Sequence, residues 1–203
     1  WSGSSLQDLY ETLSQRPTTA MASLFVAAMR EWKRSFEGQA RSFAGLQMRI
    51  EKVMDVSIAR EIERVECETS LYAFVQKAWK YVDPSPFVHG WPLEAMCEHL
   101  EAVVDGDIRK LLINIPPRCG KSSIVSVCFP AWVWTQRENT ATSGPQVPLL
   151  HASYAMSLAM RDSVKTRRLI ESPWYQRLWG ERFHLVGDQN TKGRFQNDKR
   201  GER

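Results

Sequence analysis

The chain has 203 residues, enough to bury a hydrophobic core, and it is 43% hydrophobic and 25% charged. These proportions exclude an intrinsically disordered chain, which has few hydrophobic residues and a high net charge. The net charge of +4 is compatible with a nucleic-acid partner but does not by itself predict one, because acidic and basic residues are well mixed.

The first part of the chain, residues 5–80, is predicted to be helical throughout. Apolar residues recur every three or four positions from Leu46 to Val65 with charged residues between them, which is typical of an amphipathic helix. Pro17 and Gly38 are expected to break the helices before it. The spacing is not a sustained heptad, so it does not predict a coiled coil.

Two further helices follow, over residues 70–81 and 93–104. Asp83-Pro84-Ser85-Pro86 is expected to end the first, since proline lacks an amide donor and constrains the residue before it. Asp105-Gly106-Asp107 is a turn signal that ends the second.

The pattern then changes to alternating strands and helices. Strands are predicted at 109–115, 149–154 and 183–186, and helices at 122–136, which Pro130 should kink or shorten, and 155–171. A polar loop (137–148), an aromatic turn (174–179) and a polar tail with almost no apolar anchor (187–203) complete the chain. This alternation predicts an α/β fold with a parallel sheet.

The first predicted strand runs directly into Gly120-Lys121-Ser122 at the start of a helix, which is the layout of a phosphate-binding P-loop. Lys121 is expected to contact the β- and γ-phosphates, Ser122 to ligate Mg²⁺, and the backbone amides of Cys119 to Ser123 to surround the anion. Pro117 belongs to the same nucleotide-binding loop.

Arg118 and Ile115 are the unusual residues of this loop. Arg118 either braces phosphate oxygens with its guanidinium, as a catalytic partner of Lys121, or is a solvated loop residue. Cys119 is interpreted as a small loop residue and not as a nucleophile. Ile115 stands where a glycine is usual, which argues against small nucleoside kinases and GTPases.

Pro116-Pro117-Arg118-Cys119-Gly120-Lys121-Ser122, followed by Phe129-Pro130-Ala131-Trp132-Val133-Trp134, resembles the ATPase domain of the large terminase subunit of tailed bacteriophages. Further similar motifs lie on both sides, in the family's order, at residues 70–75, 86–91, 98–103, 152–170, 172–176 and 188–203. The resemblance covers about residues 66–203, whereas residues 1–65 resemble no family that we can name.

The resemblance implies a P-loop NTPase sheet (66–203) with an N-terminal helical extension (1–65). It also implies the ATP-binding part of a viral DNA-packaging motor, which hydrolyses ATP with Mg²⁺ to move double-stranded DNA into a procapsid. The implied partners are DNA, a portal protein, a small terminase subunit and further copies of the chain in a ring. The implied location is the host cytoplasm, with transient residence at the portal. An arginine-bearing loop is normal for this family.

The chain departs from the family in one respect. In the family, a Walker B strand ends in paired acids that orient the attacking water. No apolar run ending in paired acids occurs between Ser122 and Arg203. The family's nuclease acids are absent too. The parallel sheet is therefore expected to be incomplete, and the chain to be an N-terminal part of a longer protein or a truncated product. We expect nucleotide binding but no turnover from this chain alone.

Several other residues have two interpretations each. Phe87 and Trp91 either stack on adenine or pack in an aromatic core. Ser153 and Tyr154 either sense nucleotide or contact DNA, or they cap a strand.

Basic and aromatic residues further along the chain are also open to two interpretations. Arg161, Lys165 and Arg168 share a helix face and either contact DNA phosphates or a neighbouring subunit, or are solvated. The basic residues of the tail are interpreted as loop charges: Lys192, Arg194, Lys199, Arg200 and Arg203. Four tryptophans are interpreted as core residues: Trp132, Trp134, Trp174 and Trp179.

Two alternatives to the packaging motor remain open. A helicase-like DNA translocase would need an adenine-reading glutamine ahead of the loop, and residues 83–110 contain none. A non-catalytic module would use its helical arm, residues 5–65, to dock a portal or partner subunit.

Four scattered cysteines without Cys-x-x-Cys spacing predict reduced thiols. The four histidines lack metal-ligand spacing. No signal peptide and no stretch of 18 apolar residues occurs, so no membrane partner is predicted.

Overall fold

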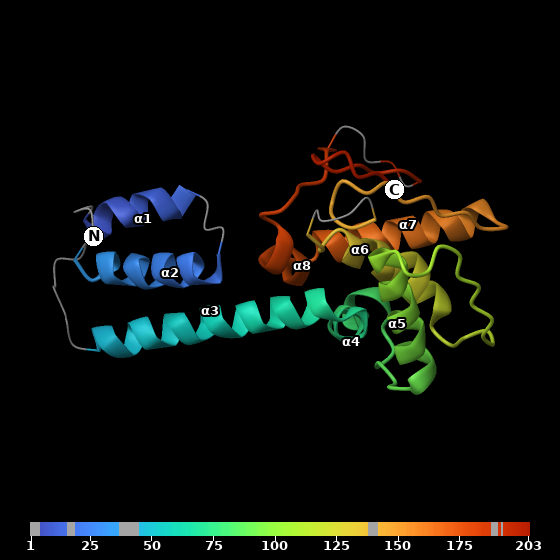
Figure 1. Ribbon diagram of the computed structural model, residues 1–203, viewed down its shortest axis with the longest axis horizontal. Coiled ribbons are helices and arrows are strands. Elements are labelled where there is room, and N and C mark those ends of the chain that lie inside the picture. Colours follow the sequence, from blue (N-terminus) through green and yellow to red (C-terminus); the bar gives the residue numbers. More distant parts are fainter. Residues whose placement is uncertain (1–4, 16–18, 37–44, 138–141, 188–190, 192) are drawn as a thin grey trace. The chain divides into compact units, whose positions relative to one another are not determined.

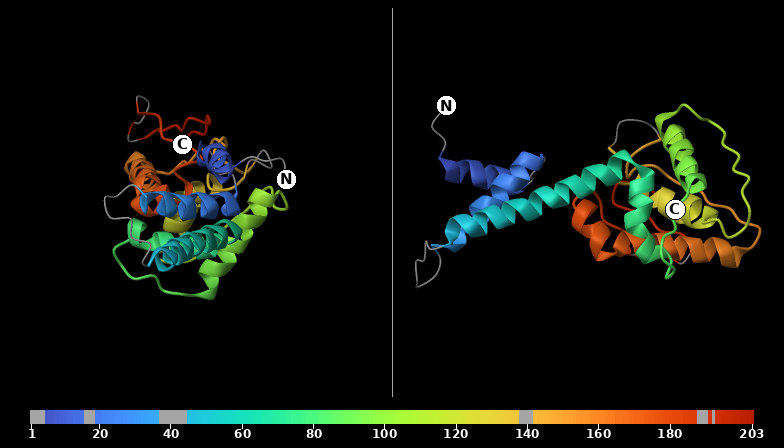
Figure 2. Two further views of the ribbon diagram at one scale, coloured as in Figure 1. Left: turned by 90° about the vertical axis from the view of Figure 1, so that its left-hand side faces the viewer. Right: turned by 90° about the horizontal axis from the view of Figure 1, so that it is seen from below.

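The computed structural model describes residues 5–15, 19–36, 45–137, 142–187, 191 and 193–203. Of these, 63% are helical. The chain divides into two compact units, Trp1–Arg64 and Val65–Arg203, which are described separately here (Figures 1 and 2). The expected helix breaks at Pro17 and Gly38 lie outside the described residues.

The first unit contains α1 (Leu6–Gln15), α2 (Ala20–Arg34) and most of α3 (Leu46–Thr69). The first two helices begin with side-chain caps. Ser5 Oγ accepts a hydrogen bond from the amide of Asp8 (3.2 Å), and Thr19 Oγ1 accepts one from the amide of Ala22 (3.2 Å). Such caps satisfy amides that the first helical turn leaves unpaired. The Nζ atom of Lys33 lies 4.1 Å from the ring centroid of Tyr10, which ties α2 to α1.

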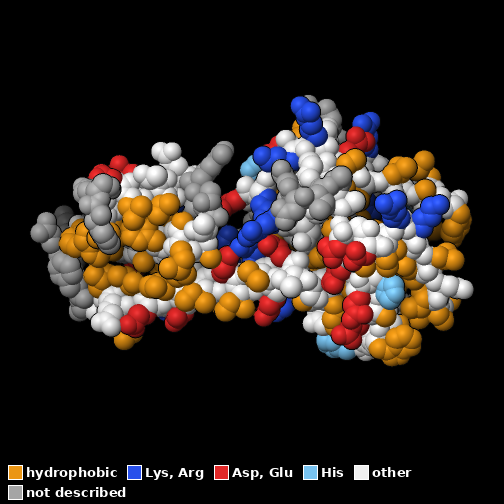
Figure 3. All heavy atoms as spheres, viewed as in Figure 1, with side chains coloured by type: hydrophobic (Ala, Val, Ile, Leu, Met, Phe, Trp, Pro, Cys, Tyr) orange, Lys and Arg blue, Asp and Glu red, His pale blue; other side chains and the backbone are white. Residues whose placement is uncertain are grey.

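The predicted amphipathic helix is confirmed as α3, but much of its apolar stripe is exposed. Ile58 and Ile62 keep 40% and 54% of their surface accessible. Figure 3 shows hydrophobic side chains gathered over α1, α2 and α3. Within the described residues of this unit, the buried hydrophobic side chains are Ala22 and Val26.

The second unit carries the main hydrophobic core. Its helices are α4 (Leu71–Val82), α5 (Trp91–Asp105), the π-helix η1 (Ser123–Cys128), α6 (Phe129–Val133), α7 (Met156–Glu171) and α8 (Pro173–Trp179). The helices predicted over 70–81, 93–104 and 155–171 are therefore confirmed. Helix α4 packs against α5, α6, η1 and α7.

Aromatic side chains fill the centre of this core. The ring centroids of Phe74 and Trp174 lie 5.4 Å apart, and those of Tyr175 and Trp179 lie 5.0 Å apart. The indole of Trp134 donates a hydrogen bond to the carbonyl of Val147 (2.9 Å), so its polar atom is satisfied inside the core. The prediction that Trp132, Trp134, Trp174 and Trp179 are core residues is confirmed.

The predicted parallel sheet, and with it the α/β P-loop NTPase fold, is wrong. The described residues form an all-helical fold without a strand, and their isolated bridges are antiparallel, joining Leu185 to Asn197 and Gln196 to Glu202. The segments predicted as strands at 109–115 and 149–154 have no regular secondary structure and lie in no sheet.

The physical reason is that a strand needs a neighbour for its hydrogen bonds. Among the described residues, none is bonded to the backbone of residues 109–115, and the amide of Leu149 bonds to the carbonyl of Glu202 instead (2.7 Å). The side chains of this segment still differ in burial: Leu111 and Ile113 pack against the core, whereas Leu112 is 93% exposed.

Pro130 alters the helix that follows the loop. The helix predicted over 122–136 begins at Lys121 and continues through η1 and α6 to Val133. In η1 the amide of Phe129 bonds to the carbonyl of Ile124, five residues back, as in a π-helix. Proline has no amide to offer the carbonyl of Ser126, four residues before it. That carbonyl accepts hydrogen bonds from Thr166 Oγ1 (3.3 Å) and from the guanidinium of Arg203 instead.

The prediction that the tail lacks an apolar anchor is also wrong. The Phe195 side chain is completely buried, with its ring centroid 5.7 Å from that of Trp134. Phe195 and Arg203 exchange two backbone hydrogen bonds of 2.7 and 2.9 Å. The interpretation of Arg203 as a loop charge is corrected, because its side chain is buried; Lys192 lies outside the described residues.

Candidate functional site

The loop before η1 contains two left-handed residues. Arg118 has φ of 69° and Gly120 has φ of 72°. Helical backbone begins at the next residue, Lys121. This conformation suits glycine, but in an arginine it costs about 1–2 kcal/mol. Strain of this kind often accompanies a binding loop.

Unpaired backbone amides occupy the start of the helix. Within the described part of the chain, no group accepts a hydrogen bond from the amides of Cys119 to Ser123. The first helical bond in this region runs from the amide of Ile124 to the carbonyl of Gly120 (3.0 Å). A helix N-terminus carries a partial positive charge, so these amides can bind an anion.

Three side chains of this loop are exposed around those amides, namely Arg118, Lys121 and Ser122. No carboxylate of the described residues forms an ion pair with Arg118 or Lys121. Pro117 is exposed beside them, whereas Cys119 and Ser123 are half-buried. The thiol of Cys119 faces the carbonyl of Pro117 at 4.0 Å, which agrees with a local packing role.

Side chains of helices α4 and α5 pack against the loop at Gly120. A Cβ atom on Gly120 would lie 3.5 Å from Leu93 Cδ2 on α5 and 3.5 Å from Trp79 Cη2 on α4. The loop therefore rests directly on the indole of Trp79.

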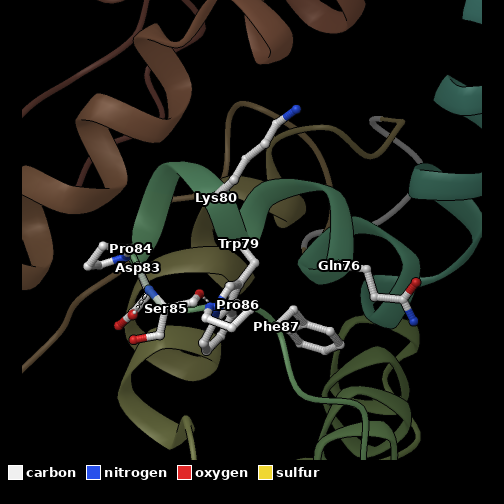
Figure 4. A pocket seen from close by; sticks show the side chains of 8 residues that line it. All are labelled: Gln76, Trp79, Lys80, Asp83, Pro84, Ser85, Pro86 and Phe87. Atoms are coloured by element: carbon white, nitrogen blue, oxygen red, sulfur yellow. Dashed lines mark hydrogen bonds between the residues drawn. The ribbon is translucent and has the colours of Figure 1, made fainter.

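Trp79 also forms a wall of a cavity of about 260 Å³. The other lining residues come from α4 and the segment after it, as Figure 4 shows: Gln76, Lys80, Asp83, Pro84, Ser85, Pro86 and Phe87. The Trp79 indole donates a hydrogen bond to the carbonyl of Ser85 (2.9 Å), which holds this segment against the helix. We call this space the Trp79 cavity.

The structure separates the two residues predicted to contact adenine. Phe87 lines the Trp79 cavity, and its ring centroid lies 5.2 Å from that of Trp79 at an interplanar angle of 70°. It also packs against Tyr72 and His89, so its interpretation as an aromatic packing residue is confirmed, whereas its contact with adenine stays a prediction. Trp91 is 78% exposed at the start of α5 and is not among the residues that line the cavity.

The cavity also contains a glutamine, Gln76, which lies before the segment 83–110 in which the sequence predicts no adenine-reading glutamine. Gln76 lies on α4 three residues before Trp79, and Figure 4 shows it beyond Phe87, away from Asp83. Residues three or four apart share a helix face, so this spacing was the available signal.

Asp83 is the carboxylate of the Trp79 cavity. Hydrogen bonds from the backbone and side chain of Ser85 lower the pKa of Asp83, and the positive charge of Lys165 lowers it further. Lys165 is half-buried on α7.

The three basic residues of α7 therefore have different surroundings. Arg161 lies 2.9 Å from the buried carboxylate of Asp162, Lys165 lies near Asp83, and Arg168 is exposed. The exposure of Arg161 and Arg168 agrees with a solvated helix face, whereas Lys165 is half-buried; contact of these residues with DNA or a neighbouring subunit stays a prediction.

Ser153 and Tyr154 are both exposed in the irregular segment before α7. Because no strand is present among the described residues, the strand-cap interpretation of these two residues is wrong. A role in sensing nucleotide or contacting DNA stays a prediction.

Within the described ranges, no three His, Cys, Asp or Glu side chains are grouped so that they could hold a metal ion. Of the helices described, none has the length and apolarity to cross a membrane. In comparisons with known proteins, no family model matched the chain, and neither a curated protein nor a solved structure matched it.

Proposed function

We propose that residues 117–123 bind the phosphates of ATP together with Mg²⁺. The observation that carries this proposal is the set of unpaired amides from Cys119 to Ser123, which open a helix between two exposed cations, Arg118 and Lys121. Amides, a helix N-terminus and neighbouring positive charges favour the same ligand, a multiply charged phosphate.

Each exposed side chain of the loop has a role in this proposal. The ammonium of Lys121 neutralises the β- and γ-phosphates, and the planar guanidinium of Arg118 contacts two phosphate oxygens at once. The hydroxyl of Ser122 suits Mg²⁺, which accepts oxygen ligands and usually takes few of them from the protein, the rest being phosphate oxygens and water. The bound ion would offset phosphate charge.

The Trp79 cavity is the proposed place for the base. Trp79 joins it to the loop, and its aromatic and proline side chains offer flat apolar contacts. Its volume of about 260 Å³ is smaller than the roughly 300–1,000 Å³ of most ligand sites, which suits a base and not a whole nucleotide.

We further propose that the chain is the ATP-binding part of a DNA-packaging motor of the large-terminase kind. This step rests on the resemblance of residues 66–203, as do the proposed partners: double-stranded DNA, a portal protein, a small terminase subunit and further copies in a ring. Hydrolysis also needs a group that orients water. No apolar run ending in paired acids, which would supply such a group, occurs between Ser122 and Arg203, so we expect this chain to bind ATP without rapid turnover.

A helicase-like translocase is a second candidate, and the position of Gln76 favours it. A side-chain amide offers both a donor and an acceptor and can therefore recognise the edge of adenine. In this candidate Gln76 discriminates ATP from GTP, whereas the packaging-motor proposal assigns it no such role.

The test is a titration of the chain with ATP and Mg²⁺. Lys121→Ala removes a charge-assisted contact and is expected to weaken ATP affinity roughly tenfold or more. Lys110→Ala is the matched control, because this lysine is exposed on the irregular segment before the loop. Equal affinities of Lys121→Ala and the unaltered chain would refute the phosphate site. In the same titration, a loss of ATP-over-GTP preference in Gln76→Ala would favour the second candidate.

A further inference from the structure

A second cavity, of about 140 Å³, lies beside the first half of α7. It is lined by residues 149–151, by one face of α7, and by Gly193 and Arg203 of the tail. None of these residues belongs to the phosphate loop or to the Trp79 cavity. We call it the α7 cavity.

Two polar atoms in the α7 cavity lack hydrogen-bond partners. Ser163 Oγ and His151 Nε2 are both buried, and no described group forms a hydrogen bond with either atom, although Asp162 Oδ2 lies 3.8 Å from His151 Nε2. Only 6% of the Ser163 surface is accessible. A buried hydroxyl left unpaired costs about 1–3 kcal/mol, so a ligand atom that bonds to it is favoured.

Among the described residues, basic side chains near the α7 cavity outnumber the carboxylates that could neutralise them. The guanidinium of Arg203 is buried and donates hydrogen bonds to two neutral acceptors, Thr166 Oγ1 and the carbonyl of Ser126. The acid beside it, Asp162, also lies 2.9 Å from Arg161 and 3.8 Å from His151 Nε2. The single carboxylate of Asp162 thus interacts with three basic side chains, those of Arg161, His151 and Arg203.

This imbalance affects Arg203 itself. Burial lowers the pKa of Arg203 to about 10, and the negative charge of Asp162 acts in the opposite direction without compensating fully. An additional negative charge in the cavity would therefore stabilise the guanidinium.

We propose that the α7 cavity binds a small anion through a carboxylate or phosphate group. Ser163 Oγ and His151 donate to its oxygens, Arg203 supplies the positive charge, and the side chains of Met156, Ala159 and Met160 contact its apolar part. The ligand is held at the junction of α7 and the tail, and this site is independent of ATP at the phosphate loop.

The experiment follows the ring resonances of His151 by NMR while inorganic phosphate, and separately acetate, is added at constant pH. Lys121→Ala provides the background, so that phosphate at the loop contributes nothing. A saturable shift of the His151 signals is expected, with roughly tenfold weaker binding in Ser163→Ala because a hydrogen bond to a charged group is lost.

Ser157→Ala is the matched control, since Ser157 is exposed near the start of the same helix. Far-UV circular dichroism checks that each variant is folded, and His151→Gln, followed through the Ser163 amide, provides an independent variant. If neither anion gives a saturable shift at millimolar concentrations, or if Ser163→Ala binds as tightly as Ser157→Ala, the proposal is wrong. Saturation by phosphate alone or by acetate alone would identify which anionic group the cavity accepts.

Discussion

At the scale of single residues, the loop combines one residue suited to its conformation with one that is strained. Gly120 adopts φ of 72° without cost, whereas Arg118 adopts φ of 69° despite its Cβ atom. Among the described non-glycine residues, Arg200 in the tail is the other one with positive φ. The guanidinium of Arg118 is thus held at the loop at the expense of stability, which is expected where a side chain serves binding.

Arg118→Gly should therefore separate stability from binding. We expect the free energy of unfolding to rise by up to about 1 kcal/mol, because the left-handed strain is relieved. We expect ATP affinity to fall, because a phosphate contact is lost. Urea denaturation and nucleotide titration measure the two effects. In Arg109→Gly, where φ is not positive, stability should not rise; if it rises there as much as in Arg118→Gly, the strain argument fails.

The contiguous part of the site could be predicted from the sequence, because Arg118 to Ser123 follow one another and the helix begins within them. The Trp79 cavity could not be predicted in full. Gln76 and Trp79 reach the loop only through the packing of α4 beneath Gly120, and this contact leaves no local pattern. Phe87 and Trp91 have the same two interpretations in the sequence, yet Phe87 lines the cavity and Trp91, four residues later, is exposed.

At the scale of elements, helices and strands differed in how well they could be predicted. Helix α4 satisfies its own backbone hydrogen bonds, so its apolar spacing was sufficient. The segment 109–115 contains a short apolar run like that of a buried strand, but a strand depends on a distant neighbour that local sequence does not specify. The π-helix η1 was also missed; Pro130 indicated a disturbance but not its kind.

Hydrogen exchange should distinguish these two kinds of element. Amides of residues 109–115 are expected to exchange nearly as fast as in an unfolded peptide, because no described group bonds to them. Amides in the middle of α4, such as that of Ala78, should be strongly protected and serve as the internal reference. Protection of alternate amides in 109–115 would indicate strand pairing and contradict the all-helical description.

At the scale of the whole molecule, the two units differ in how they are stabilised. The second unit encloses many large aromatic side chains, including Trp134, Tyr175 and Trp179. The described part of the first unit buries Ala22 and Val26 and exposes apolar residues on each of its helices. The second unit is therefore expected to retain its structure independently of the first.

Trp179→Ala tests this independence. Removing a fully buried indole should destabilise the second unit by about 3–5 kcal/mol, while the helices of the first unit remain. NMR signals from each unit, followed during thermal unfolding, measure the two responses. Trp32→Ala is the control in the first unit, where this side chain is 43% exposed. An equal fall in the melting temperature of the second unit in both variants would show that the units unfold together.

Pro130 makes distant positions in the chain depend on one another. It leaves the carbonyl of Ser126 without its helical donor, and Thr166 and Arg203 provide hydrogen bonds in its place. A change at Arg203 should thus be harmful when residue 130 is proline and milder when residue 130 can donate its own amide. These positions are constrained as a set, so related sequences that lose the proline are free to lose the arginine, and the helix behind the phosphate loop keeps its backbone satisfied in both cases.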